Sequence, residues 1–226
     1  MRQPLLYYNE LTVEGRKNMK YDSTDLPQAV KDYLDEITDN EELCDAFYDC
    51  DIEIYDEDWV KDIEDDKAWL EDLMGPGEST YENMKPFARD GSGALWVVID
   101  DEMIGYIGTE GECGIVAKNI NEFMNIVSVY RGCLADIWDV DILESEEAFL
   151  DAAGENEENE VFDSFIEKHG FTTDLKDVYR MIISGMTVKP FLVHKATDDD
   201  YVDSYSLVGH DDGQEALEDL INRLSE

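Results

Sequence analysis

The spacing of apolar residues predicts helices in the first third of the chain. Between residues 25 and 75, apolar side chains recur three or four positions apart, and acidic residues occupy the opposite face. This period is typical of amphipathic helices that cover a core. The clearest of three such stretches carries Trp59, Val60, Ile63, Leu70, Leu73 and Met74. The breaker sequence GPG follows at residues 75–77, so we expect the third helix to end there.

The middle of the chain has a different pattern. Three short apolar runs stand at residues 94–99, 103–107 and 113–117, with turn-forming residues between them. Runs of this length, rich in β-branched and aromatic residues, predict strands joined as an antiparallel meander. Asn119 then stands at the N-cap of a predicted helix that includes Phe123.

The last third of the chain combines both patterns. Its predicted elements are two acidic helices, two strands and a closing helix, at residues 144–152, 159–169, 191–194, 201–208 and 214–224. The polar stretch 153–159 is the best linker candidate, although such a loop does not require a domain boundary. We expect a single domain over residues 1–226, with an acidic helical part (25–75) before the sheet and an α/β extension (150–226) after it. The predicted fold class is α+β, with an antiparallel sheet wrapped by helices.

The charge of the chain is unusual. It carries 57 acids against 17 Lys and Arg residues, a formal net charge of −40, whereas solubility needs a magnitude of only about 2–8 in a small domain. Such a surface repels DNA, RNA and anionic membranes, which bind proteins through Lys and Arg, and it attracts basic proteins. We therefore expect a basic protein partner, and neither nucleic acid nor a membrane. The alternative is an acid-rich proteome of the halophilic kind, in which the carboxylates serve solubility alone.

The acids are densest between residues 32 and 82, where 21 acids stand beside only two bases, Lys61 and Lys67. Nine acids of this stretch are our candidates for contact with a partner. They are Asp49, Asp51, Glu53, Asp56, Glu57, Asp58, Asp62, Asp65 and Asp66. Association through such a surface is steered by long-range attraction and weakens with salt.

Signatures of catalysis are missing from the sequence. It contains no GxxxxGK[ST], GxGxxG, GxSxG or HExxH motif. Asp49 and Asp51 begin like a calcium-binding EF-hand loop, but Ile54 and Val60 occupy the positions of its Gly and its bidentate Glu. The three histidines are scattered, and among 57 acids some pair always suits glycoside hydrolysis, so that hypothesis stays open without support. We predict a protein that is not an enzyme and uses no cofactor or metal.

The cysteines and the hydropathy of the chain bear on its location. No two of the four cysteines have CxxC spacing, and a domain of this size does not need disulfides, so we expect reduced thiols. No apolar segment typical of a signal peptide follows Met1, and nowhere do about 18 consecutive apolar residues occur. These observations predict a cytoplasmic protein.

Residues 84–130 carry an ordered set of short motifs. The chain reads KPFARDGSG at residues 85–93, directly before the run at 94–99, then YIGTEGE at 106–112 and NEFM at 121–124. In order and spacing this segment resembles the SUKH superfamily, the group around the Smi/Knr-type fungal cell-wall regulators. The resemblance implies a single α+β domain without a shared catalytic site, whose matching residues shape the fold. Those residues are Gly91, Gly93, Glu110 and Gly111 in turns, and Trp96 and Phe123 in the core.

The resemblance also has a functional implication, because many bacterial members resemble immunity proteins that bind and neutralise toxins delivered between competing cells. Charge and resemblance together favour an immunity-type inhibitor that neutralises a basic toxin, for example a nuclease, through an acidic surface. Two alternatives stay open: a DNA-mimic inhibitor of a nucleic-acid-binding protein, and a regulatory adaptor with no toxin partner.

Overall fold

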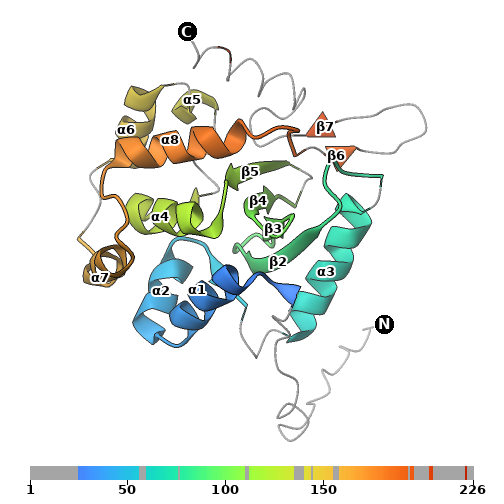
Figure 1. Ribbon diagram of the computed structural model, residues 1–226, viewed down its shortest axis with the longest axis horizontal. Coiled ribbons are helices and arrows are strands. Elements are labelled where there is room, and N and C mark those ends of the chain that lie inside the picture. The colour runs from blue at the N-terminus through green and yellow to red at the C-terminus, as the bar shows by residue number, and fades with distance from the viewer. Residues whose placement is uncertain are drawn as a thin grey trace, which may run out of the picture.

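The computed structural model describes residues 25–55, 60–75, 77–109, 112–134, 140–143, 145–154, 158–192, 194–195, 204–205 and residue 222. Within this part of the chain, five antiparallel strands form the main sheet, and helices cover both of its faces (Figure 1). The fold class is therefore α+β, with an antiparallel sheet packed between helices, as the sequence predicts.

The strands of this sheet lie side by side in chain order. They are β1 (Glu53–Ile54), β2 (Met84–Arg89), β3 (Leu95–Ile99), β4 (Met103–Ile107) and β5 (Cys113–Ala117). The last three form the predicted meander, and Asp100 and Asp101 adopt positive φ values of 51° and 62° in the turn between β3 and β4. Positive φ values at two successive residues are typical of the tight hairpin turn whose twist matches that of the strands. The sequence pattern does not predict β1 or β2, because β1 is very short and Lys85 and Pro86 interrupt the apolar run of β2.

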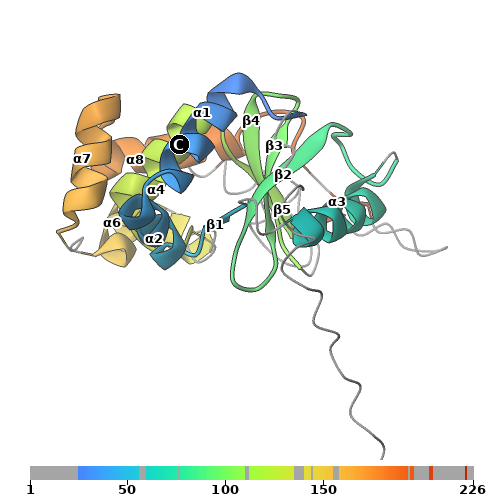
Figure 2. The same ribbon diagram turned by 90° about the horizontal axis from the view of Figure 1, so that it is seen from below.

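Two cores lie on opposite faces of the sheet. The larger core contains buried side chains of α1 (Gln28–Thr38), α2 (Glu41–Asp49), α4 (Ile120–Tyr130), α5 (Val140–Leu143), α6 (Glu146–Ala153), α7 (Glu160–His169) and α8 (Leu175–Met186). These side chains pack with Trp96 and Val98 of β3. On the other face, α3 (Val60–Met74) packs near Leu95 and Val97 (Figure 2). Because successive side chains of a strand point to opposite faces, helices bury both faces of β3.

The helix α8 lies directly against the edge strand β5. A side chain at Gly185 would place its first carbon 2.7 Å from the carbonyl oxygen of Val116, which is closer than van der Waals contact. The glycine therefore allows the helix to approach the strand. The sequence prediction omits α8, although Asp174 caps it by accepting the Lys176 N–H at 2.9 Å and its apolar residues recur at helical spacing.

The predicted cap of α4 is confirmed. Asn119 accepts the Glu122 N–H at 2.9 Å, and the Glu122 carboxylate accepts the Lys118 N–H at 3.0 Å. The Asn119 side chain thus satisfies an N–H that the first turn leaves without a helical partner, and the Glu122 carboxylate ties the residue before the cap to the helix. None of the helices in the described part of the chain combines the length and the apolarity needed to cross a bilayer.

The later elements differ from the sequence prediction. In the region of the two predicted strands, the described residues contain β6 (His194–Lys195) and β7 (Ser204–Tyr205), which pair with each other. Phe191 and Leu192 are buried but belong to no strand. Phe191 packs in the larger core and Leu192 in the core on the α3 face. The closing helix predicted at residues 214–224 lies outside the described residues, apart from residue 222.

Candidate functional site

Three of the acids predicted to contact a partner are half-buried and bind other residues of the same chain. Asp51 accepts the Gly91 N–H at 2.8 Å. Glu53 pairs with Arg89 across β1 and β2 at 3.3 Å, and Asp66 accepts the Tyr55 hydroxyl at 2.6 Å. These contacts give Asp51, Glu53 and Asp66 structural roles that the sequence pattern does not reveal.

The other predicted acids do not gather into one surface. Asp49 lies at the end of α2 and is exposed, as are Asp62 and Asp65 on α3. Because α2 and α3 cover opposite faces of the sheet, these acids belong to two separate surfaces (Figure 2). The remaining three predicted acids, Asp56, Glu57 and Asp58, lie outside the described residues.

Acids do converge at a cleft of about 650 Å³ between the α1–α2 corner and α7. We call this the acidic cleft and define it by Asp39, Glu42 and Glu160, with Leu43, Val161 and Phe165 as its apolar lining. The three carboxylates are exposed, and none forms an ion pair within the part of the chain that the structure describes. Glu36 and Lys168 also line the cleft and pair with each other, so its net charge is the negative charge of the three remaining carboxylates beside an apolar lining.

Two of these carboxylates stand at helix starts. Glu42 lies in the first turn of α2 and Glu160 in the first turn of α7. Asn40 and Asn159 cap the same two helices through their side-chain oxygens. Because the positive end of each helix dipole stabilises a nearby carboxylate, the fold tolerates these two charges close to the cleft.

One wall of the acidic cleft is fixed by Glu36 of α1. Its carboxylate lies 2.7 Å from the Lys168 ammonium and 3.1 Å from Nε2 of His169, both in the last turn of α7. Burial opposes ionisation of Glu36, but the hydrogen bonds from Lys168 and His169 outweigh it and lower the pKa of this carboxyl. The His169 ring also stacks on Phe171 and lies beside Tyr33. These contacts hold α1 and α7 together and so set the width of the cleft.

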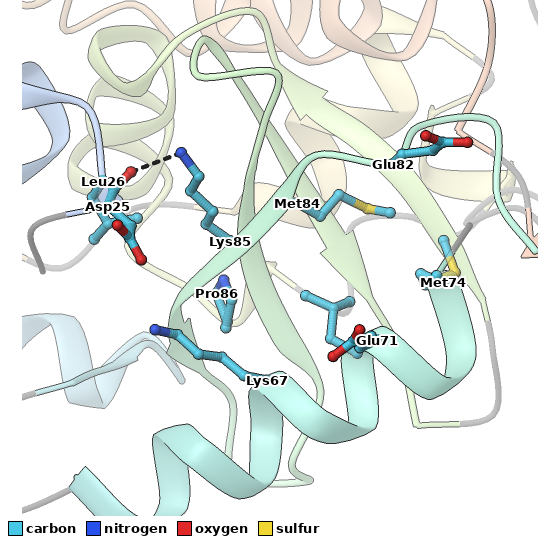
Figure 3. Close-up of a pocket in the computed structure, with 11 residues that line it drawn as sticks. Asp25, Leu26, Lys67, Glu71, Met74, Glu82, Met84, Lys85 and Pro86 are labelled. Carbon is cyan, nitrogen blue, oxygen red and sulfur yellow. Dashed lines mark hydrogen bonds between the residues drawn. The ribbon is translucent and has the colours of Figure 1, made fainter. Parts of the chain in front are cut away.

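A second concave site, the α3–β2 groove, has a volume of about 370 Å³ (Figure 3). Leu70 and Met74 of α3, Met84 and Pro86 of β2 and Leu26 give it an apolar lining. Its charged lining residues are Asp25, Lys67, Glu71, Glu82 and Lys85. Lys85 donates to the Asp25 carbonyl oxygen at 2.7 Å and to the Asp101 carboxylate at 2.6 Å.

The segment 84–130, which resembles the SUKH superfamily, contains a buried polar turn at residues 90–94. Asp90 is 2% exposed, and its Oδ1 accepts the backbone N–H groups of Ser92 and Ala94, both at 2.9 Å, and the Ser92 hydroxyl at 2.7 Å. Its Oδ2 accepts the Tyr106 hydroxyl at 2.8 Å. Gly93 has a φ of 92°, which requires glycine, as the resemblance implies. The sequence prediction does not single out Asp90, although an acid before GSG is a known signal for such a turn.

The other residues of this motif also have structural positions. Trp96 and Phe123 are buried in the larger core, in agreement with the resemblance. A Cβ built on Gly91 would lie 3.0 Å from the Asp51 carboxylate, so the turn packs tightly there. Glu110 and Gly111 lie outside the described residues.

Metal-ligating side chains do not converge in the described part of the chain, where no three His, Cys, Asp or Glu residues could share an ion. His169 is engaged with Glu36, His194 is in β6, and His210 lies outside the described residues. The two concave sites are therefore the features from which a function can be argued.

Comparisons of the chain with family models, with curated proteins and with solved structures gave no match.

Proposed function

We propose that this protein is a partner-binding protein, an immunity-type inhibitor that neutralises a basic toxin domain by engaging it at the acidic cleft. The observation that carries the proposal is the set of three exposed carboxylates, Asp39, Glu42 and Glu160, around a cleft with an apolar lining. A Lys or Arg side chain fits such a cleft, because its aliphatic stem packs on apolar residues while its charged end reaches the carboxylates.

The net charge of −40 supports the same partner chemistry. Enzymes that act on nucleic acid need basic clefts to bind phosphate, so a nuclease toxin presents the complementary surface. Attraction between opposite charges raises the association rate of two proteins above the usual 10⁵–10⁶ M⁻¹s⁻¹, up to about 10⁸–10⁹ M⁻¹s⁻¹ at low salt. A resident inhibitor gains from fast association, because it must occupy the toxin before the toxin reaches its substrate.

The test compares two variants with the same change in net charge. In the first, Asp39, Glu42 and Glu160 become Asn, Gln and Gln. In the control, three exposed acids elsewhere, Asp72, Glu102 and Asp151, become Asn, Gln and Asn. Each variant is co-expressed with the toxin candidate encoded beside its gene, and growth is scored. Association with the purified toxin is then followed by stopped flow at low and high salt.

We expect the cleft variant to lose protection and to associate about tenfold more slowly at low salt, while the control stays close to the wild type. If both variants slow association equally, charge alone steers the partner and the cleft does not bind it. If neither variant slows association and salt does not change the association rate, the proposed electrostatic binding is wrong. A toxin-free genomic context with binding to a DNA-binding protein would favour the DNA mimic instead.

A further inference from the structure

Within the described residues, one edge of the sheet beside the α3–β2 groove has no strand paired along part of its length. β1 pairs with β2 only at Arg89 and Ala88, where Glu53 and Ile54 face them. On the same side, the Tyr55 N–H donates to the Phe87 carbonyl oxygen at 3.3 Å. No strand in the described part of the chain pairs with the first half of β2, residues 84–86, on this side.

The backbone of Met84 points toward this open side. The Asn83 carbonyl oxygen accepts the Asp100 N–H at 2.9 Å, so the polar groups of Asn83 face the β3 side of β2. Backbone groups of successive residues in an antiparallel strand point to alternate sides, so the N–H and C=O of Met84 face away from β3. An edge of this kind is a template for an added strand.

The groove lies where such a strand would run. Leu26, on one side of it, belongs to the larger core, whereas Leu70 and Met74, on the other side, belong to the core on the α3 face. The groove therefore lies between the two layers that cover the sheet, in line with the sheet and next to residues 84–86 (Figure 3). Two methionines, Met74 and Met84, line it, and methionine adapts to apolar side chains of different shapes.

Charges at the two ends of the groove give it a polarity. Figure 3 shows Lys67 and Lys85 at the end near Asp25, and Glu82 at the end near Met74. The Lys85 ammonium is already paired with Asp101, but the Lys67 ammonium forms no ion pair within the described residues. Lys67 can therefore pair with an acidic group of a ligand at the end where Asp25 also lies, and Glu82 can pair with a basic group at the other end.

We propose that the α3–β2 groove binds an extended peptide segment of a second protein, which adds to the sheet as an antiparallel strand along residues 84–86. The segment continues the direction of β1, places an apolar side chain against Leu70 and Met74, and carries an acidic residue N-terminal and a basic residue C-terminal to it. Main-chain hydrogen bonds to Met84 supply binding, and the groove and its end charges supply sequence preference. This site is separate from the acidic cleft and does not depend on the function proposed for it.

The probe is a phage-displayed library of random ten-residue peptides, selected on the full chain. The most enriched peptide is then synthesised with a fluorescein label, and its binding is measured by anisotropy. Lys67→Glu reverses the end charge, and Met84→Trp fills the groove. Lys118→Glu is the matched control, because Lys118 is an exposed lysine outside the groove. Thermal melts establish that each variant is folded.

We expect enriched peptides in which an acid precedes and a base follows a central apolar residue. Lys67→Glu and Met84→Trp each lower the affinity for the enriched peptide at least tenfold, and Lys118→Glu leaves that affinity unchanged. Amide exchange of the full chain separates strand addition from side-chain docking, because the Met84 N–H exchanges freely without peptide and at least tenfold more slowly with it.

Three results would overturn the proposal. The first is a selection in which the wild-type chain enriches no peptides beyond those that the Met84→Trp variant also enriches. The second is a peptide whose binding leaves Met84 exchange unchanged. The third is a Met84 amide that is already protected in the free full chain, which would mean that the chain covers this edge with a segment of its own.

Discussion

Substitution of Asp90 tests whether the buried turn before β3 stabilises the whole fold. The Asp90 carboxylate accepts four hydrogen bonds, and two of their donors, the Ala94 N–H and the Tyr106 hydroxyl, are buried. Asp90→Ala removes the acceptor and leaves both donors without a partner. Each unsatisfied buried group costs about 1–3 kcal/mol, so we expect a loss of about 4 kcal/mol in the free energy of unfolding. For a chain of this size that loss lowers Tm by about 8–16 °C.

Asp90→Asn is the matched control for this loss. The amide keeps the shape of the side chain, its oxygen can still accept the three bonds made to Oδ1, and its NH₂ group can donate to the Tyr106 oxygen. The charge and the acceptor of the Tyr106 O–H are lost, but the hydroxyl oxygen keeps a hydrogen bond to the side chain, so we expect a cost of about 1 kcal/mol. Urea unfolding followed by circular dichroism, with linear extrapolation, measures both variants. If Asp90→Ala costs less than about 1 kcal/mol, or no more than Asp90→Asn, the hydrogen-bond network does not stabilise the fold as argued.

The hydrogen bond between Tyr106 and Asp90 also bears on how the stability of the fold depends on alkaline pH. Burial raises the pKa of Tyr106 above its usual value of 10.0, and the hydrogen bond to Asp90 raises it further. A group whose pKa is higher in the folded state stabilises the fold below its unfolded pKa and loses that contribution as pH rises toward the folded value. Stability should therefore fall above about pH 10, and it should fall less steeply in Tyr106→Phe. Equal slopes for the two proteins would show that Tyr106 stays protonated in both states or ionises in both alike.

Three further predictions concern packing, charge and thiol chemistry. Gly185→Ala should cost about 1–3 kcal/mol in urea unfolding, because its Cβ would meet the Val116 backbone, while Ser184→Ala on the same helix should cost less than about 0.5 kcal/mol. Raising the salt concentration from about 10 mM to about 150 mM should raise Tm by about 5 °C, since it screens the repulsion among 40 net negative charges; an unchanged Tm would contradict this. Burial, and then the Asp49 charge, raise the pKa of Cys50 to about 12, so N-ethylmaleimide at pH 8 should label it only after unfolding, as mass spectrometry would show.

Much of the fold follows from local pattern, and the exceptions have physical reasons. Strands β3 to β5 are continuous apolar runs between turn residues, and α4 starts at an asparagine cap, so short-range chemistry predicts them. The pattern misses β1 and β2 because their pairing partners define them: Glu53 and Ile54 form a strand only by facing Arg89 and Ala88. It also misses α8, whose contact with β5 depends on Gly185, a residue that usually argues against a helix.

The candidate site was harder to predict from the sequence than the fold, because the role of an acid depends on groups that are distant in the chain. Asp51 lies in the densest acidic stretch, yet its carboxylate accepts the N–H of Gly91, 40 residues further on. The local density of acids therefore points to a residue whose carboxylate binds the backbone of the same chain. The acidic cleft instead brings Asp39 and Glu42 next to Glu160, from a helix that packs against α2 through Phe47, Phe162 and Phe165. Packing of apolar faces, rather than the local concentration of charge, therefore decides which carboxylates lie together without a cationic partner. Such a group attracts a basic side chain more strongly than the same carboxylates would if they were apart.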